Sequence, residues 1–240
     1  KRPQCVEEFL KLLNASVAPL KENGRKVDTT SIIITSYLNE QEVVGANKDE
    51  STLLVDSITE DKSIEAIDLG LSVKWANCNI GALKPTDCGN YYAWGEIAPK
   101  TEYTYENCST LGKQLGDISG NANYDAATAN WGAPWRMPTR EELKELIDNC
   151  TFKWTTQNGT TGRLVTGKNG NSIFFPANGC YLGTSLCDNI FKGFYWSSTN
   201  CDNGIFPDKS AYYIGFSIEK KCYMDWFMRF YGYGVRPVSD

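Results

Sequence analysis

Cysteine and histidine are the residue types that would reveal chemistry most directly in this chain, because a thiolate or an imidazole can attack a substrate or bind a metal. The sequence has nine cysteines and no histidine. The lack of histidine excludes Ser-His-Asp and Cys-His catalysis, as well as zinc sites built on histidine. No two cysteines lie closer than seven residues, so no Cys-x-x-Cys motif of a zinc ribbon or a thioredoxin-type site occurs. We therefore predict no metal site and no cofactor.

The cysteines also leave the redox state open. An odd number leaves at least one thiol unpaired within the chain, and the spacing does not match the tight, even-numbered patterns of secreted disulfide frameworks. Cys78 and Cys150 are expected to serve as small apolar residues.

The adjacent carboxylates Glu141 and Glu142 could in principle serve as an acid–base pair. Their position has a structural explanation, because Thr139 is a good N-cap and Glu142 stands three residues later, as in a capping box. Apolar residues then recur at helical spacing over residues 143–147. The pattern predicts a helix that packs on a sheet, and no catalytic pair.

Composition sets the broad class of the protein. The chain has 240 residues, 41% of them hydrophobic and 22% charged, which is typical of a globular protein. A net charge of −5 without a basic stretch argues against binding to nucleic acid. No apolar run approaches the roughly 18 residues of a membrane-spanning helix. The first residues do not form a signal peptide, so we expect a chain whose targeting segment has been removed.

The chain divides near residue 62. Before it we predict a helix over residues 3–20 and short strands over 31–38, 42–44 and 52–58, followed by a charged linker over 59–65. This segment, residues 1–62, has no recognised role, and display, assembly or attachment would suit it. Residues 63–240 form the second domain.

The second domain is predicted to be rich in short strands. Residues 164–166 and 172–176 flank Asn169-Gly170, the preferred dipeptide of a type I′ hairpin turn. Further strands are expected over 194–199, 211–218 and 223–231. With the helix after Thr139, the fold class is α+β.

Aromatic residues crowd the end of the chain, at 14 of the 43 positions from Phe191 to Tyr233. In the strand predicted over 223–231, alternation would put four apolar residues on one face, which we interpret as core: Met224, Trp226, Met228 and Phe230. The other face would mix aromatic and charged residues, as contact surfaces do: Tyr223, Asp225, Phe227, Arg229 and Tyr231. The alternative is a second face that a loop covers.

Three separated strings read as parts of one unit: Trp135-Arg136-Met137-Pro138-Thr139, Tyr195-Trp196-Ser197-Ser198-Thr199 and Gly234-Val235-Arg236-Pro237-Val238. Together with the strings at 65–76, 89–96, 124–129 and 171–174, they resemble the Fibrobacter succinogenes major paralogous domain (FISUMP), which is abundant in gut Bacteroidetes. The resemblance covers about three quarters of the chain. Within it, Arg136 and Arg236 are expected to tie loops together, and Trp196 to anchor the core.

The resemblance implies a C-type-lectin-like fold, an irregular antiparallel sheet with one or two helices whose last strands present a ligand surface. Some similar members are variable proteins of diversity-generating retroelements, in gut Bacteroidetes or their phage, whose surface residues are rewritten. The isolated cysteines between residues 180 and 222 would suit such rewriting. A lineage-specific surface, or a disulfide among Cys180, Cys187, Cys201 and Cys222, remains equally open.

Two related activities lack their motifs. No Glu-Pro-Asn, Gln-Pro-Asp or Trp-Asn-Asp string occurs, so we predict no calcium-dependent sugar site. The formylglycine-generating oxidase, which has a similar fold, uses a reactive cysteine pair near its C-terminus. Cys201 and Cys222 are the nearest candidates, but their surroundings do not match that family.

The expected function is a secreted or surface-displayed module, without catalytic activity, that binds a protein or a glycan. Its predicted contact residues are Tyr181, Asp188, Phe191, Asn200, Asp202, Asn203, Phe206, Tyr223, Asp225 and Phe227. The first alternative is a carbohydrate-binding adhesin that stacks sugar rings on the same aromatics. The second is an enzyme of the oxidase type. The oligomeric state is not predicted.

Overall fold

The computed structural model describes residues 64–202 and 206–240, so the helix and strands predicted before residue 62 lie outside it. The described residues form small antiparallel sheets with few helices, which agrees with the predicted α+β class. The elements in order are β1 (Ala66–Ile67), β2 (Lys74–Ala76), α3 (Ala126–Trp131), α4 (Arg140–Asn149), β3 (Thr151–Gln157), β4 (Thr160–Thr166), β5 (Ser172–Pro176), β6 (Cys180–Leu182), β7 (Ser185–Cys187), β8 (Lys192–Asn200), β9 (Ser210–Ser217), β10 (Tyr223–Met228) and β11 (Val238–Ser239). No helix in this part of the chain is long and apolar enough to cross a membrane.

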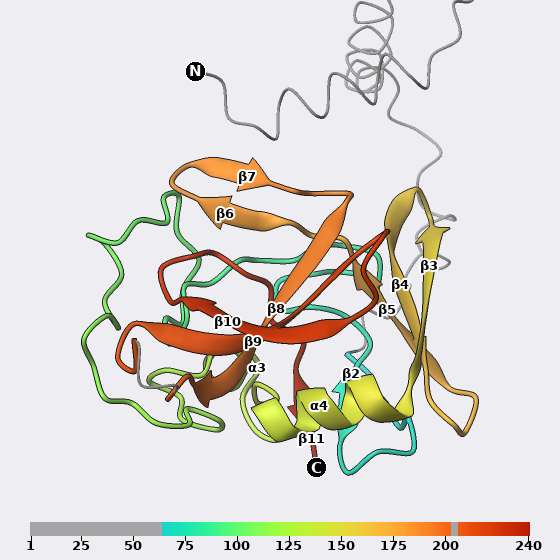
Figure 1. The fold of residues 1–240 in the computed structure, drawn as a ribbon. Helices are drawn as coiled ribbons and strands as arrows, with labels where there is room; N and C mark the ends of the chain where they lie inside the picture. The colour runs from blue at the N-terminus through green and yellow to red at the C-terminus, as the bar shows by residue number, and fades with distance from the viewer. Residues whose placement is uncertain (1–63, 203–205) are drawn as a thin grey trace, which may run out of the picture. The chain divides into compact units, whose positions relative to one another are not determined.

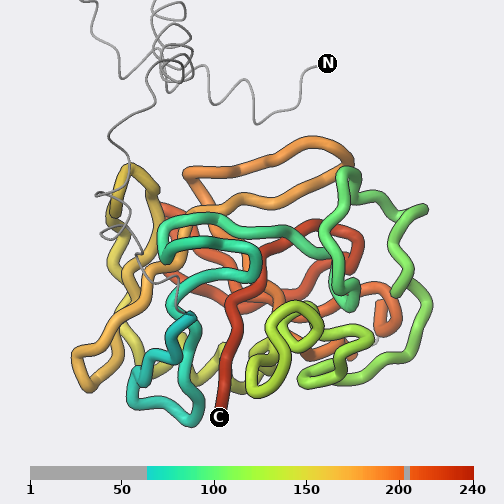
Figure 2. Tube along the Cα trace, turned by 180° about the vertical axis from the view of Figure 1, so that it is seen from behind, coloured from blue at the N-terminus to red at the C-terminus, as the bar shows by residue number. Residues whose placement is uncertain are grey.

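The sheet β10-β9-β8 is the centre of the domain, and β10 is one of its edges. Helix α4 lies along one face of this sheet, where it contacts all three strands (Figure 1). The sheet β3-β4-β5 lies to one side, and the hairpin β6-β7 lies at the end remote from α4 (Figure 1). Strand β11 pairs with β2, so the two ends of the domain lie side by side (Figure 2).

The core lies on both faces of the central sheet, because the residues of β8 alternate between two apolar clusters. Trp196 joins the cluster with Tyr213 and Tyr233, and its ring stacks on Tyr233 at 4.3 Å between centroids. Tyr195 faces the other way, into the cluster that α4 covers with Leu143 and others. Trp196 is 0% and Tyr195 1% exposed, so the predicted core role of Trp196 is confirmed.

The predicted helix start is confirmed at α4. The Glu142 amide donates to Thr139 Oγ1 at 3.2 Å, and the Thr139 amide donates to Glu142 Oε2 at 2.8 Å. Arg136 binds both oxygens of the same carboxylate, at 2.7 and 2.9 Å. The Glu142 carboxylate is therefore fully engaged in structural hydrogen bonds.

Replacing Thr139 with alanine is expected to lower the free energy of unfolding by about 1 kcal/mol, because the Glu142 amide loses its acceptor. Urea denaturation followed by circular dichroism measures this loss. Thr139→Ser keeps the hydroxyl and should recover most of the stability. An alanine variant as stable as the wild type would contradict a stabilising cap.

The hairpin turns differ from the prediction at Asn169-Gly170. A type I′ turn needs positive φ at both central residues, but among 167–171 only Gly170 has one, at 89°. The Asn169 side chain instead donates to the Asp68 carbonyl at 2.9 Å, across to the start of the domain. Two consecutive residues with positive φ occur instead in the tight turn between β3 and β4, at Asn158 (47°) and Gly159 (79°).

Buried arginines tie separate segments together. Arg236 donates to the carbonyls of Ala76 and Phe174 at 3.0 and 2.7 Å, and to Asn79 Oδ1 at 2.8 Å, which confirms its predicted role. Arg229 corrects the prediction, since it is 0% exposed and does not lie on a contact face. Strand β10 ends at Met228, so the alternation stops before Arg229.

Candidate ligand-binding groove

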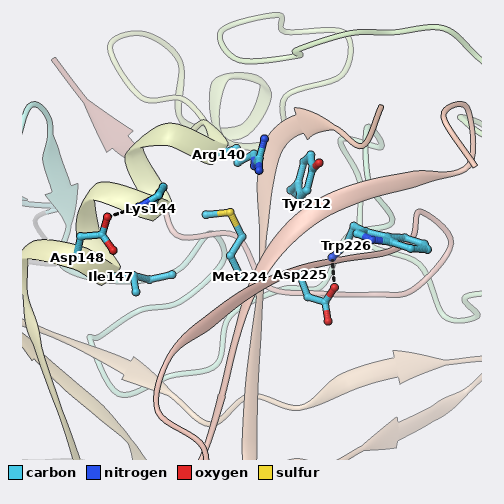
Figure 3. A pocket seen from close by; sticks show the side chains of 8 residues that line it. All are labelled: Arg140, Lys144, Ile147, Asp148, Tyr212, Met224, Asp225 and Trp226. Carbon is cyan, nitrogen blue, oxygen red and sulfur yellow. Dashed lines mark hydrogen bonds and ion pairs between the residues drawn. The ribbon is translucent and has the colours of Figure 1, made fainter. Parts of the chain in front are cut away.

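A groove of about 390 Å³ lies between α4 and strands β9 and β10 of the central sheet (Figure 3). Its size is at the small end of the range for ligand pockets, about 300–1,000 Å³. The residues that line it are Arg140, Lys144, Ile147, Asp148, Tyr212, Met224, Asp225 and Trp226.

The floor of the groove is a pair of aromatic residues on neighbouring strands. Trp226 of β10 lies directly opposite Tyr212 of β9 in the antiparallel ladder, so the two side chains share one face of the sheet. Met224, two residues before Trp226, packs against the cluster under α4. Trp226 and Tyr212 lie beyond this covered part and are half-buried.

One wall of the groove is Arg140, the first residue of α4. Its guanidinium lies over the Tyr212 ring, 4.3 Å from the centroid. Its amide donates to Thr199 Oγ1 at 3.0 Å, which fixes the helix start against β8. Within residues 64–202 and 206–240, no carboxylate forms an ion pair with Arg140.

The other charged residues of the groove already have partners or point elsewhere. Lys144 forms an ion pair with Asp148 one turn along α4, and both side chains are largely exposed. Such surface pairs contribute about 0–1 kcal/mol, so a ligand can compete for Lys144. Asp225 Oδ1 accepts from the Trp226 amide at 2.9 Å, and its carboxylate points away from Arg140 (Figure 3).

The Tyr212 hydroxyl is a neutral hydrogen-bonding group. Burial raises the pKa of Tyr212, and a hydrogen bond with Cys201 raises it further, whereas the nearby charge of Arg140 lowers it. The net change is upward, so the phenol keeps its proton at neutral pH. It can donate and accept hydrogen bonds beside the Arg140 cation.

Some of the predicted contact residues lie at or near this groove. Asp225 lines it, and the Phe206 ring lies 6.4 Å from the Trp226 ring, with Phe206 42% exposed. Asp202 is exposed and close enough to act on the pKa of Tyr212. Asn203 lies outside the described residues.

Three predicted contact residues belong instead to the region of β6 and β7. Tyr181 packs edge-on against Tyr91 at 4.9 Å between centroids. Asp188 pairs with Lys192 at 3.2 Å, and Phe191 is half-buried in the same turn. These residues shape the hairpin, and Figure 1 shows it remote from α4.

The last three lie at β8 and on the opposite face of β10. Asn200 Oδ1 accepts from the buried Arg229 at 2.7 Å. Tyr223 is half-buried, with Lys220 Nζ 3.8 Å from its ring centroid. Phe227 is 38% exposed and packs against Tyr231 at 4.7 Å between centroids. The structure therefore does not gather the predicted residues into one surface.

Sequence reasoning missed most of the groove. Trp226 was expected in the core and is a half-buried groove residue, while Arg140, Lys144 and Tyr212 were not predicted as contact residues. The missing information is the register that pairs Trp226 with Tyr212, which the sequence does not encode locally.

The two cysteines nearest to the oxidase pattern do not form a pair. The Cys201 amide binds the Ser210 carbonyl at one end of β9, whereas Cys222 precedes Tyr223, which pairs with Gly215 near the other end. Five residues of strand span about 17 Å, too far for a redox pair. Burial also raises the pKa of Cys222 to about 12, so its thiol stays protonated. Cys180, by contrast, lies directly opposite Cys187 in the β6-β7 hairpin.

No protein-family model, no curated protein and no solved structure matches this chain. Its function is therefore inferred from the side chains of the groove and from their surroundings.

Proposed function

We propose that residues 63–240 form a non-catalytic ligand-binding module, secreted or displayed at a cell surface, and that the groove holds its ligand. The observation that carries this proposal is the half-exposed pair of Tyr212 and Trp226 beside Arg140, a cation without an acidic partner in the described chain. Aromatic rings and arginine are the side chains that contribute most at binding sites.

The resemblance to FISUMP domains supports the placement of a ligand surface on the last strands, and we propose the C-type-lectin-like fold on the same ground. The three strings that carry the resemblance, over residues 135–139, 195–199 and 234–238, lie next to one another in the structure. The Arg136 and Val238 backbones pair, the Ser198 amide donates to the Pro138 carbonyl at 2.8 Å, and Tyr195 bridges Gly234. Such a frame would hold β9 and β10 rigid while groove residues change.

The size of the groove favours a glycan over a protein as the ligand. A protein partner covers about 800 Å² on each side of a stable interface, which needs a broad surface. A volume of about 390 Å³ suits a small ring-shaped group. The carbohydrate-binding adhesin is therefore the form of the proposal that the geometry favours.

Diversification of this surface is a separate proposal, which the DNA beside the gene would test. A neighbouring reverse transcriptase gene, with a template repeat that matches the codons of residues 200–228, would support it. A locus without either element would leave a binder of fixed specificity.

Two adjacent residues allow a sharp test of the binding face. Trp226 and Phe227 follow one another on β10 and lie on opposite faces, and both rings are partly exposed. On a glycan array, Trp226→Ala should weaken the binding of every bound glycan by about tenfold or more, since stacking rings are hot spots. Phe227→Ala is the matched control and should leave binding unchanged.

Loss of glycan binding with Phe227→Ala alone would move the site to the opposite face of β10. An array without any bound glycan, together with strong binding to a protein panel, would favour the protein-binding form. Thermal melting of both variants checks that the fold is intact.

A further inference from the structure

We infer that the groove recognises a sugar that carries a carboxylate, as part of an acidic glycan, with Arg140 as the partner of the carboxylate and Trp226 as the stacking surface. This inference rests on the proposed binding function and adds the chemical class of the ligand. It is carried by the geometry of three side chains from α4, β9 and β10.

Arg140 is positioned to bind a planar anion. Its guanidinium carbon lies over the Tyr212 ring, 4.3 Å from the centroid, and no side-chain hydrogen bond occupies its N–H edge among the described residues. This edge matches the two oxygens of a carboxylate, which it binds with two parallel hydrogen bonds. Because the stacking restricts the side chain before the ligand arrives, less conformational entropy is lost on binding.

Of the two cations that line the groove, Arg140 is the one without an ion-pair partner among the described residues. Lys144 is shared with Asp148, and Asp225 is turned away (Figure 3). Asp202 acts on the Tyr212 hydroxyl but does not come within ion-pair distance of Arg140 among the described residues. An anion in the groove therefore meets a positive group without displacing a carboxylate.

The aromatic floor selects a ring rather than a flexible acidic side chain. Trp226 lies opposite Tyr212 on two hydrogen-bonded strands, so its partly exposed ring offers an apolar surface on the same face as the cation over Tyr212. The C–H face of a pyranose can cover such a surface. A glutamate side chain would pair with Arg140 but leave Trp226 uncovered.

The residues around the site hold it in place. The capping box and the bond from the Arg140 amide to Thr199 fix the start of α4. Thr199 Oγ1 in turn donates to Asp117 Oδ2 at 2.8 Å. The Tyr212 carbonyl accepts from Ser197 Oγ at 2.9 Å, so its strand is tied to β8 as well.

The test compares matched acidic and neutral sugars by isothermal titration calorimetry. One arm uses trigalacturonate and its methyl ester, and the other uses sialyllactose and lactose, which separates uronic acids from sialic acids. The wild type should bind the acid of at least one arm about tenfold or more tightly than its neutral counterpart, as expected for a charge-assisted pair. This preference should shrink at high salt.

The decisive variant is Arg140→Gln, which should bring the acid to the affinity of its neutral counterpart. Lys153→Gln is the matched control, because it removes an exposed positive charge from β3 and should leave the preference intact. Trp226→Ala should weaken acid and neutral sugar alike.

The outcomes separate this inference from the proposed function. Equal affinity for acid and neutral sugar would overturn the inference of an acidic ligand. If binding still depended on Trp226, the proposed binding function would be retained. An acid preference that survives Arg140→Gln would also overturn the inference. If an acetylated glutamate peptide binds and no sugar does, the ligand is not a sugar, although Arg140 still binds an anion.

Discussion

Replacing Arg236 with alanine is expected to lower the free energy of unfolding by about 4 kcal/mol. Arg236 is 1% exposed, and its guanidinium satisfies three buried acceptors on two segments far from it in the chain: the Ala76 carbonyl and the Asn79 side chain on one, and the Phe174 carbonyl on the other. A buried acceptor that loses its donor costs about 1–3 kcal/mol. The variant also loses the contact with the Phe175 ring, 4.6 Å from the guanidinium carbon.

Burial of this cation has a cost of its own, which limits the net effect. Desolvation lowers the pKa of Arg236 to about 10, and no carboxylate is among its hydrogen-bond partners. Removal of the side chain nevertheless leaves three buried acceptors without a donor, and this loss sets the sign of the effect. Arg236→Lys should recover little stability, because a single ammonium cannot reach three acceptors in the same geometry.

Urea denaturation measures the effect, with Arg140→Ala as the control. Arg140 is exposed and makes no side-chain hydrogen bond within the described residues, so its loss should change stability by no more than about 0.5 kcal/mol. If Arg236→Ala costs less than Thr139→Ala, Arg236 does not hold the segments together.

The parts of the fold that could be predicted have local signals. The capping box at Thr139 and Glu142 specifies α4 within four residues, and the alternating pattern specifies β8 and β9 to within two residues at each end. Arg236 was expected to tie loops together from its place in the string over residues 234–238, and its hydrogen bonds to the Ala76 and Phe174 carbonyls confirm this.

The groove could not be predicted, because it depends on how far one element covers another. Alternation along β10 separates Trp226 from Phe227 correctly, but it does not show which face is buried. Helix α4 covers the β10 face as far as Met224 and leaves Trp226 partly open. No residue pattern marks the end of β10 at Met228 either. Arg229 was therefore expected at the surface, although it is fully buried.

Above about pH 10 the domain is expected to lose stability steeply and to unfold cooperatively. Five tyrosines in the described chain are buried, and the pKa of each is raised, first of all by burial: Tyr92, Tyr103, Tyr195, Tyr213 and Tyr233. An unfolded tyrosine ionises at a pKa of about 10. A raised pKa in the folded state means that stability is complete below pH 10 and is lost as pH rises from there toward the folded-state pKa.

The loss of stability from the buried tyrosines exceeds the gain from the two buried arginines. At pH 11 a tyrosine that keeps its proton in the folded state takes away about 1 kcal/mol, so several together remove a large part of the whole stability of a typical domain, about 5–15 kcal/mol. Arg229 and Arg236 act in the other direction, because burial lowers both pKa values to about 10 and the folded state releases these protons first. Two such groups offset part of the loss from five tyrosines.

Absorbance at 295 nm, which reports tyrosinate, should therefore rise together with the loss of circular dichroism as pH increases. Tyr233→Phe is a sharp variant, since it keeps the ring that stacks on Trp196 at 4.3 Å but removes one titrating group. Its unfolding midpoint should move to higher pH. If absorbance rises smoothly around pH 10 while the circular dichroism stays native, the tyrosines ionise within the fold, and burial does not hold their protons.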